Sequence, residues 1–247
     1  MSNSFIVTPL PINNVQFKNR ILRSSVGGRM FNYDGTVTDV WINSENRFAA
    51  AAVGRIISTT FHVNKDRVSP RQYPSIADPK FVPYLKKFIA GIKQRSPDCR
   101  YIVQIGDPGY TTYMSLFPKE QDCKSSSSGF DLGFGYNNTR TMMSNAEIEK
   151  AIIDFADAAE RVKASGADGL EITATKDYLI HQFLSPGINR RSTIGVAVRT
   201  AGFACCKELC KQCATGSDAT TCLASGSRPL ISTTARCNFP FFVFPLC

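Results

Sequence analysis

Residues 173–178, TATKDY, place several polar side chains directly after the apolar run GLEI. The Tyr178 phenol has an ordinary pKa of about 10, so it is protonated at neutral pH and can act as a proton donor. The Lys176 ammonium can supply positive charge to an anionic or carbonyl oxygen, and Asp177 beside it can neutralise that charge. The alternative for Tyr178 is a structural role, as a buried tyrosine whose hydroxyl is hydrogen-bonded.

A second group of reactive side chains lies near the C-terminus, where seven of the nine cysteines follow residue 204. Cys206, Cys210 and Cys213 have the spacing C-x3-C-x2-C. We expect no metal site here, and the alternative is that these thiols bind zinc, with Cys222 as a fourth ligand, or an iron–sulfur cluster. An odd number of cysteines without a secretory signal argues against the disulfide framework of a secreted protein.

The composition is that of a globular protein with one large domain. The chain has 247 residues, of which 43% are hydrophobic and 20% charged. The formal net charge is +9, but the Lys and Arg residues are scattered, which argues against nucleic-acid binding. The longest apolar run, FPFFVFPLC, is about half of what a membrane span needs. We therefore expect a cytoplasmic protein that binds neither nucleic acid nor membrane.

Strands and helices that would position these residues alternate along the chain. Runs of apolar and β-branched residues predict strands over 21–25 (ILRSS), 55–61 (RIISTTF), 101–106 (YIVQIG) and 169–173 (GLEIT). The first helix is expected over 38–52, TDVWINSENRFAAAA, closed by Gly54.

Two further helices carry clear start signals. Asp78 can cap a helix that has Pro79 in its first turn, and that helix has an apolar stripe made of Phe81, Leu85, Phe88, Ile89 and Ile92. Ser144 and Glu147 have the spacing of a capping box for a helix that Gly166 ends. The alternation of strands and helices predicts an α/β fold with right-handed crossovers between parallel strands.

The connection over 107–143 is unusually long and rich in Ser, Gly and Asn. It leaves the carboxyl end of a strand, which is where barrel enzymes build their sites, so a functional role is expected. A flexible surface insertion is the alternative.

Five motifs together resemble one protein family. FKNRILRSS, GRIIST, YIVQIG, GADGLEI and DYLIHQFLSPGINRR follow one another within residues 5–191. They resemble the old yellow enzyme family of FMN-dependent NADH:flavin oxidoreductases and ene-reductases. The resemblance implies a partial (β/α)8 TIM barrel of about four βα units, which holds FMN at the carboxyl ends of its strands. Residues 1–191 would form the N-terminal half of this barrel, and residues 192–247 an irregular Cys-rich tail.

The resemblance also assigns roles to single residues. Six of them would contact the flavin: Ser24, Ser25, Val26, Gly27, Thr60 and Gln104. The backbone of the first four would line the ring, Thr60 would be the small residue that approaches it, and the Gln104 amide would complement its pyrimidine edge. The alternative is ordinary barrel packing, with Gln104 as a satisfied core amide.

The implied reaction takes hydride from NADH or NADPH to FMN, and then from reduced FMN to the β-carbon of an activated alkene in a small-molecule substrate. Tyr178 aligns with the proton donor. Thr173 and Lys176 stand where the family has the His and the His or Asn that clamp the substrate carbonyl, so these two are the substrate-binding candidates. The substitutions and the missing half of the barrel predict impaired activity. A catalytically inactive remnant or a binding module is the alternative. The fourth strand would have an open edge, and the alternatives for this edge are cover by the tail segment FPFFVFPLC and self-association with another copy of the chain.

The resemblance stops at Arg191, and the genetic code offers an explanation. Codons read from the third base of Ser192 onward allow a family-like continuation, and leucine codons displaced by one base become cysteine codons. We therefore hypothesise a one-base slip near Ser192 that puts the tail out of frame. Resequencing the gene around this codon tests the hypothesis.

Overall fold

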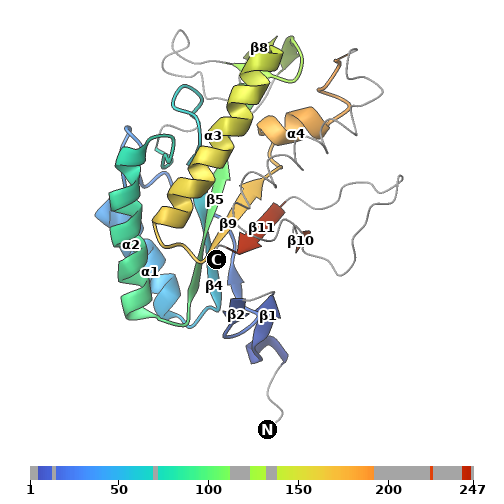
Figure 1. Cartoon of the computed structure of the whole chain (residues 1–247). Helices are drawn as coiled ribbons and strands as arrows, with labels where there is room; N and C mark the ends of the chain where they lie inside the picture. Colours follow the sequence, from blue (N-terminus) through green and yellow to red (C-terminus); the bar gives the residue numbers. More distant parts are fainter. Residues whose placement is uncertain are drawn as a thin grey trace.

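The structure is a computed structural model. It describes residues 5–12, 15–68, 72–111, 123–131 and 138–191, together with the backbone of 223–224 and 241–245. Four parallel strands form the centre of the main sheet, in the order β9–β5–β4–β3 (Figure 1). They are β3 (Leu22–Arg23), β4 (Arg55–His62), β5 (Arg100–Gly106) and β9 (Gly169–Thr173). The last three match the expected strands closely, whereas the first is shorter than the expected 21–25.

Two strands from the C-terminal region complete this sheet. Strand β11 (Phe241–Pro245) pairs antiparallel with β9, with Phe241 opposite Thr173 and Pro245 opposite Gly169. Strand β10 (Leu223–Ala224) in turn pairs antiparallel with β11. Of the two alternatives for the edge of the fourth strand, cover by the tail is the one observed, because the β9 backbone groups find a partner strand in β11. Cys206, Cys210, Cys213 and Cys222 lie outside the described residues.

Helices cover one face of the parallel strands (Figure 1). Helix α1 (Asp39–Ala50) begins after Thr38, whose Oγ1 accepts a hydrogen bond from the Trp41 amide at 3.3 Å. Asp78 caps the short helix η2 (Pro79–Phe81), which runs into α2 (Val82–Arg95). The predicted capping box opens α3 (Asn145–Ala164). In it, Ser144 Oγ accepts from the Glu147 amide at 3.2 Å, and Glu147 Oε2 accepts from the Ser144 amide at 2.7 Å.

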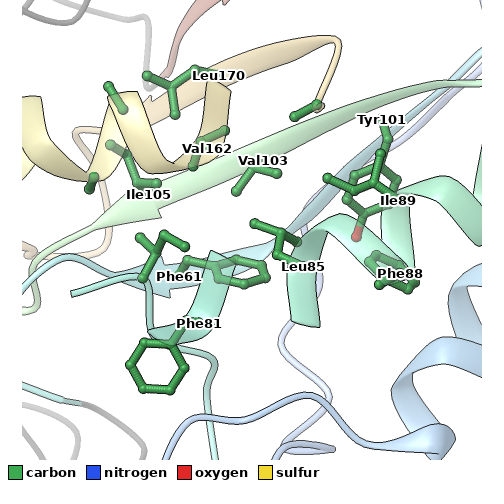
Figure 2. Packing of buried hydrophobic residues seen from close by; sticks show 14 of the residues in the cluster. Phe61, Phe81, Leu85, Phe88, Ile89, Tyr101, Val103, Ile105, Val162 and Leu170 are labelled. Atoms are coloured by element: carbon green, nitrogen blue, oxygen red, sulfur yellow. The ribbon is translucent and has the colours of Figure 1, made fainter. Parts of the chain in front are cut away.

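The main hydrophobic core lies between this sheet face and the helices (Figure 2). Alternation along β5 turns Tyr101, Val103 and Ile105 toward the helices, where they pack with the predicted stripe of α2 and with Leu170 of β9. Burial of each large apolar side chain contributes about 1.5–3 kcal/mol. Packing of this face thus fixes which β5 residues point to the opposite side, Gln104 among them.

A hairpin covers the opposite face at the amino-terminal ends of the strands. The short helix η1 (Phe5–Val7) precedes its two strands, β1 (Leu10–Ile12) and β2 (Val15–Phe17), which pair antiparallel. Phe17 packs against Ile57 and Ile102 in a small separate cluster, which we call the floor. The Arg55 guanidinium lies 4.8 Å from the centroid of the Phe17 ring, which explains how an arginine can stand at the start of a buried strand.

The connection between β5 and α3 is not a structureless loop. Its described residues include the short helix η3 (Gly109–Thr111) and three short strands, β6 (Lys124–Ser125), β7 (Gly129–Asp131) and β8 (Asn138–Met142). Arg191 ties this region to the end of the barrel segment, because its buried Nη1 donates to the carbonyl oxygens of Met143 at 2.7 Å and Ser126 at 3.3 Å. Helix α4 (Leu179–Leu184) lies between β9 and Arg191 in the sequence. None of the described helices is long and apolar enough to cross a membrane.

The end of α1 gives a stability prediction. Ala52 has a φ of 64°, a left-handed conformation that glycine adopts without steric cost. We expect Ala52→Gly to raise the free energy of unfolding by about 1 kcal/mol, measured by urea denaturation. Ala50→Gly, two residues earlier within α1, is the matched control and should lower it by about 1 kcal/mol. Equal destabilisation by both substitutions would show that the left-handed conformation of Ala52 has no steric cost.

Candidate active site

A row of polar side chains crosses the carboxyl-terminal half of the parallel sheet, on the face away from the helices. The strand register places Thr60 of β4 opposite Gln104 of β5, and Gln104 opposite Glu171 of β9. All three are almost fully buried. Ser25, in the segment that follows β3, joins them from the side of β4.

Gln104 is the centre of this row. Its Oε1 accepts hydrogen bonds from Ser25 Oγ at 3.0 Å and from Thr60 Oγ1, and its Nε2 donates to Glu171 Oε1. Its backbone amide donates to Ser58 Oγ at 2.9 Å. Three of the six expected flavin contacts are thus brought into direct contact with one another, from three different strands or strand ends.

Glu171 is a functional candidate that the sequence interpretation missed. Burial raises the pKa of Glu171 to about 7, against the opposing effects of the Gln104 hydrogen bond and the Lys176 charge. A signal was present in the sequence, because a carboxylate inside the strand GLEIT alternates with Leu170 and Ile172, which face the helices. That the Glu171 side chain points away from the helices indicates a functional role only when the strand register places Gln104 beside it.

Tyr178, Thr173 and Thr60 converge on Gly106, the last residue of β5. A Cβ atom at Gly106 would lie 2.5 Å from Thr173 Cγ2, 2.9 Å from Thr60 Cγ2 and 3.2 Å from Tyr178 Cδ2. The Tyr178 side chain is buried, and its amide donates to the Thr175 carbonyl at 3.0 Å. The expected proton donor therefore lies at the same strand ends as Thr60 and the expected substrate contact Thr173.

This convergence gives a second prediction. Gly106→Ala should lower the free energy of unfolding by about 1–3 kcal/mol, because the new methyl group must displace at least two neighbouring side chains. Thermal or urea denaturation measures the change. Gly91→Ala, inside α2 and with no atom near its added methyl group, is the control and should stabilise the chain by about 1 kcal/mol. A neutral Gly106→Ala would contradict the tight packing.

The remaining expected site residues are placed differently. Ser24, Val26 and Gly27 follow β3 at its carboxyl end, but they are exposed and lie outside the row. The Tyr73 ring packs over Gly27, where it occupies the space of a Cβ atom. Lys176 is exposed and has a φ of 56°, so the structure does not bring it into the buried cluster, although its charge acts on Glu171.

The segment before Tyr178 has an unusual backbone. Lys176 and Asp177 both adopt left-handed conformations, with φ of 56° and 54°. Such conformations are unfavourable for residues with a side chain, and persist where the surroundings impose them. Thr173 Oγ1 lies 3.3 Å from Thr175 Oγ1 at the start of this turn.

The four described parallel strands, with helices on one face, an apolar floor and polar side chains at the carboxyl ends, have the arrangement of half of a (β/α)8 barrel. Comparison with known proteins agrees. Residues 6–193 match the NADH:flavin oxidoreductase / NADH oxidase family. The chain belongs to this family, which includes the old yellow enzymes, and FMN and NAD(P)H are the family's cofactors.

Three relatives illustrate the similarity. The chain is 28% identical over 180 residues to the probable NADH-dependent flavin oxidoreductase YqiG of Bacillus subtilis, covering 73% of this chain and 46% of YqiG. It is 29% identical to an NADH:acrylate oxidoreductase of Vibrio harveyi, covering 73% of this chain and 17% of that one. The structure of an old yellow enzyme homologue from Zymomonas mobilis has a TM-score of 0.72 at 18% identity, covering 85% of this chain and 59% of the homologue, which shows the fold. The chain thus spans about half of the length of YqiG.

Proposed function

We propose that this chain binds FMN at the carboxyl ends of β3, β4, β5 and β9, and that it uses NAD(P)H to reduce an activated alkene, with activity limited by the half barrel. The observation that carries the proposal is the row Ser25–Thr60–Gln104, with Tyr178 packed on the neighbouring Gly106. FMN, when bound, supplies hydride transfer between the nicotinamide and the alkene.

The residues of the row fit the polar edge of an isoalloxazine. Such an edge alternates hydrogen-bond donors and acceptors, and the row offers an amide that has both and two hydroxyls that can act as either. The backbone of Ser24–Gly27, where all residues except Ser25 are exposed, can approach the flat ring from the side of β3. In the family resemblance the phosphate-binding loops follow later strands, so the proposed contacts concern the ring, and no residue is proposed here for the phosphate.

Tyr178 would give its phenolic proton to the α-carbon of the alkene. Thr173 and Lys176 would contact the substrate carbonyl oxygen, on which negative charge develops, from the buried and the exposed side of the turn. The Vibrio harveyi relative is named for acrylate, an alkene conjugated to a carboxylate, and this supports a small activated alkene as the substrate.

Flavin titration of the purified full chain tests the proposal. Added FMN should show quenched fluorescence and a shifted visible spectrum. Gln104→Leu should weaken FMN binding about tenfold or more, because the flavin edge loses the proposed amide contact and Ser25, Thr60 and Glu171 each lose a hydrogen-bond partner. Gln72→Leu, at a glutamine that hydrogen-bonds the exposed Tyr33 hydroxyl, is the control and should leave binding unchanged. A chain that changes neither the fluorescence nor the spectrum of FMN does not have this function.

An inactive remnant that binds a partner is the second candidate. The antiparallel strand β11 occupies the β9 edge, where a barrel would place its next parallel strand. Absence of flavin binding together with a folded, monodisperse chain would favour this candidate.

We also propose that residues 1–191 form the N-terminal half of an FMN-binding barrel and that the tail from 192 onward is out of frame. The end of the family match at residue 193 supports this boundary. Resequencing the gene around the Ser192 codon is the test, and an unbroken frame in independent isolates would refute the slip.

A further inference from the structure

A buried ion pair joins the loops that follow β4 and β5, and none of its members belongs to the expected site. The Arg67 guanidinium binds the Asp107 carboxylate at two points, with Nε 2.9 Å from Oδ1 and Nη2 2.6 Å from Oδ2. Both side chains are nearly inaccessible to solvent. Asp107 directly follows Gly106, on which the Tyr178 ring packs.

Asp107 also holds the chain on both sides of the pair. Its Oδ1 accepts from the Gly109 amide at 2.8 Å, which fixes the turn after β5. Its backbone carbonyl accepts from the Leu179 amide at 2.8 Å, and Leu179 is the residue after Tyr178. The orientation of the Asp107 peptide, set by its side chain, is therefore passed directly to the backbone that carries the phenol.

A second contact reinforces the first. Gln182 Nε2 donates to the Pro108 carbonyl at 3.0 Å and to the Asp177 carbonyl. Gly109 has a φ of 57° and lies so close to Gln182 that a Cβ atom would be 2.4 Å from its Nε2. The turn Asp107–Gly109 thus contacts the Tyr178 segment both at its start and one helical turn later.

The Tyr178 segment needs such support. Helix α4 has six residues, too few for independent stability, and the two residues before Tyr178 are left-handed. Arg67 is itself anchored, because Asn64 Oδ1 accepts from the Arg67 amide at 3.1 Å and Asn64 Nδ2 donates to Asp154 Oδ2 of α3 at 2.9 Å. The support therefore reaches from α3 to the strand ends.

We propose that Arg67 and Asp107 are positioning residues, which hold the Tyr178 phenol at the carboxyl end of β5 through the Asp107 carbonyl and the Leu179 amide. The two residues do not touch the reacting atoms. The role of the Tyr178 phenol as a proton donor rests on the proposed function, whereas the placement of the phenol by Arg67 and Asp107 does not.

The test uses the full chain labelled with 3-fluorotyrosine, with the Tyr178 resonance assigned from Tyr178→Phe. Arg67→Lys keeps the positive charge but removes the two-point contact. We expect it to shift the Tyr178 fluorine resonance and to accelerate hydrogen exchange of the Leu179 amide about tenfold or more, with the Val103 and Ile105 amides in β5 unchanged. An unchanged Tyr178 resonance and Leu179 exchange rate in the folded variant would overturn the proposal.

Arg100→Lys is the matched control, because Arg100 pairs with Asp168 at 3.3 Å near the opposite end of β5. It should leave the Tyr178 resonance in place, and an equal shift would also overturn the proposal. Should Arg67→Lys fail to fold, the double variant Arg67→Met/Asp107→Leu removes both charges together, and we expect the same faster exchange at Leu179.

These measurements need no flavin, so failure to bind FMN would contradict the proposed function and leave the positioning role intact. With FMN bound, Arg67→Lys should slow alkene reduction about tenfold and spare reduction of FMN by NAD(P)H. Equal slowing of both steps would show a general structural role instead.

Discussion

Urea is expected to unfold this chain at lower concentrations at pH 8 than at pH 5. Glu171 causes a large part of the difference, because burial raises the pKa of its carboxyl to about 7 in the folded chain, from 4.5. Above pH 4.5 the unfolded chain gains the free energy of ionisation while the folded chain does not. Stability is therefore complete below pH 4.5 and is lost as the pH rises to about 7, by on the order of 3 kcal/mol.

Glu45 adds a second contribution of the same sign. Burial raises the pKa of Glu45 to about 7, although Arg23 Nη2 at 3.1 Å and the Tyr101 hydroxyl at 3.0 Å act in the opposite direction. Its effect covers the same pH range as that of Glu171. The contributions of the two carboxyl groups to stability can therefore be distinguished by mutation, but not by a pH titration alone.

Glu171→Gln separates them. The variant should lose the Glu171 share and retain the Glu45 share, so the difference in unfolding free energy between pH 5 and pH 8 should fall by on the order of 2–3 kcal/mol. Glu149→Gln, on the exposed side of α3, should leave the difference unchanged. A Glu171→Gln variant with the full pH dependence of the parent would show that this carboxyl does not titrate as described.

Replacement of Tyr178 by phenylalanine is expected to slow alkene reduction by the FMN-loaded chain by about 10²–10⁴-fold. The proposed reaction needs a proton at the α-carbon, and phenylalanine keeps the ring that packs on Gly106 but has no proton to give. Reduction of bound FMN by NAD(P)H does not use this proton and should keep its rate. Rapid-mixing absorbance measurements follow the two steps separately.

Tyr84→Phe is the control for this prediction, because Tyr84 lies on α2 and is 53% exposed. It should leave both rates unchanged. Loss of both steps to the same extent in Tyr178→Phe would argue that the phenol supports the fold or the flavin and is not the proton donor.

Local signals in the sequence predicted most of the helices and central strands. The capping box at Ser144, the Asp78 cap and the strand GLEIT need only neighbouring residues, and all three are confirmed. The early end of the first strand depends on its partner, since only Leu22 and Arg23 pair with β4. The pairing of β11 with β9 joins segments that are far apart in sequence, which no local pattern indicates.

Part of the candidate site could be predicted from the sequence through motifs that resemble one family. Gln104 in YIVQIG and Tyr178 in DYLIHQFLSPGINRR received their roles from that resemblance. Arg67 and Asp107 received none, because their role comes from a contact between two loops 40 positions apart. Glu171 required the strand register, which places it beside Gln104.

The packing of Phe17 against Ile57 and Ile102 separates residues that stabilise the sheet from residues of the candidate site. These apolar side chains lie at the amino-terminal ends of β4 and β5, whereas Thr60, Gln104 and Gly106 lie toward the carboxyl ends of the same strands. Substitutions in the floor should therefore change the free energy of unfolding, whereas substitutions around Gly106 should change the substrate preference. Substrate preference can thus change during evolution at the carboxyl ends of these strands, while the packing of the floor at the amino-terminal ends stays the same.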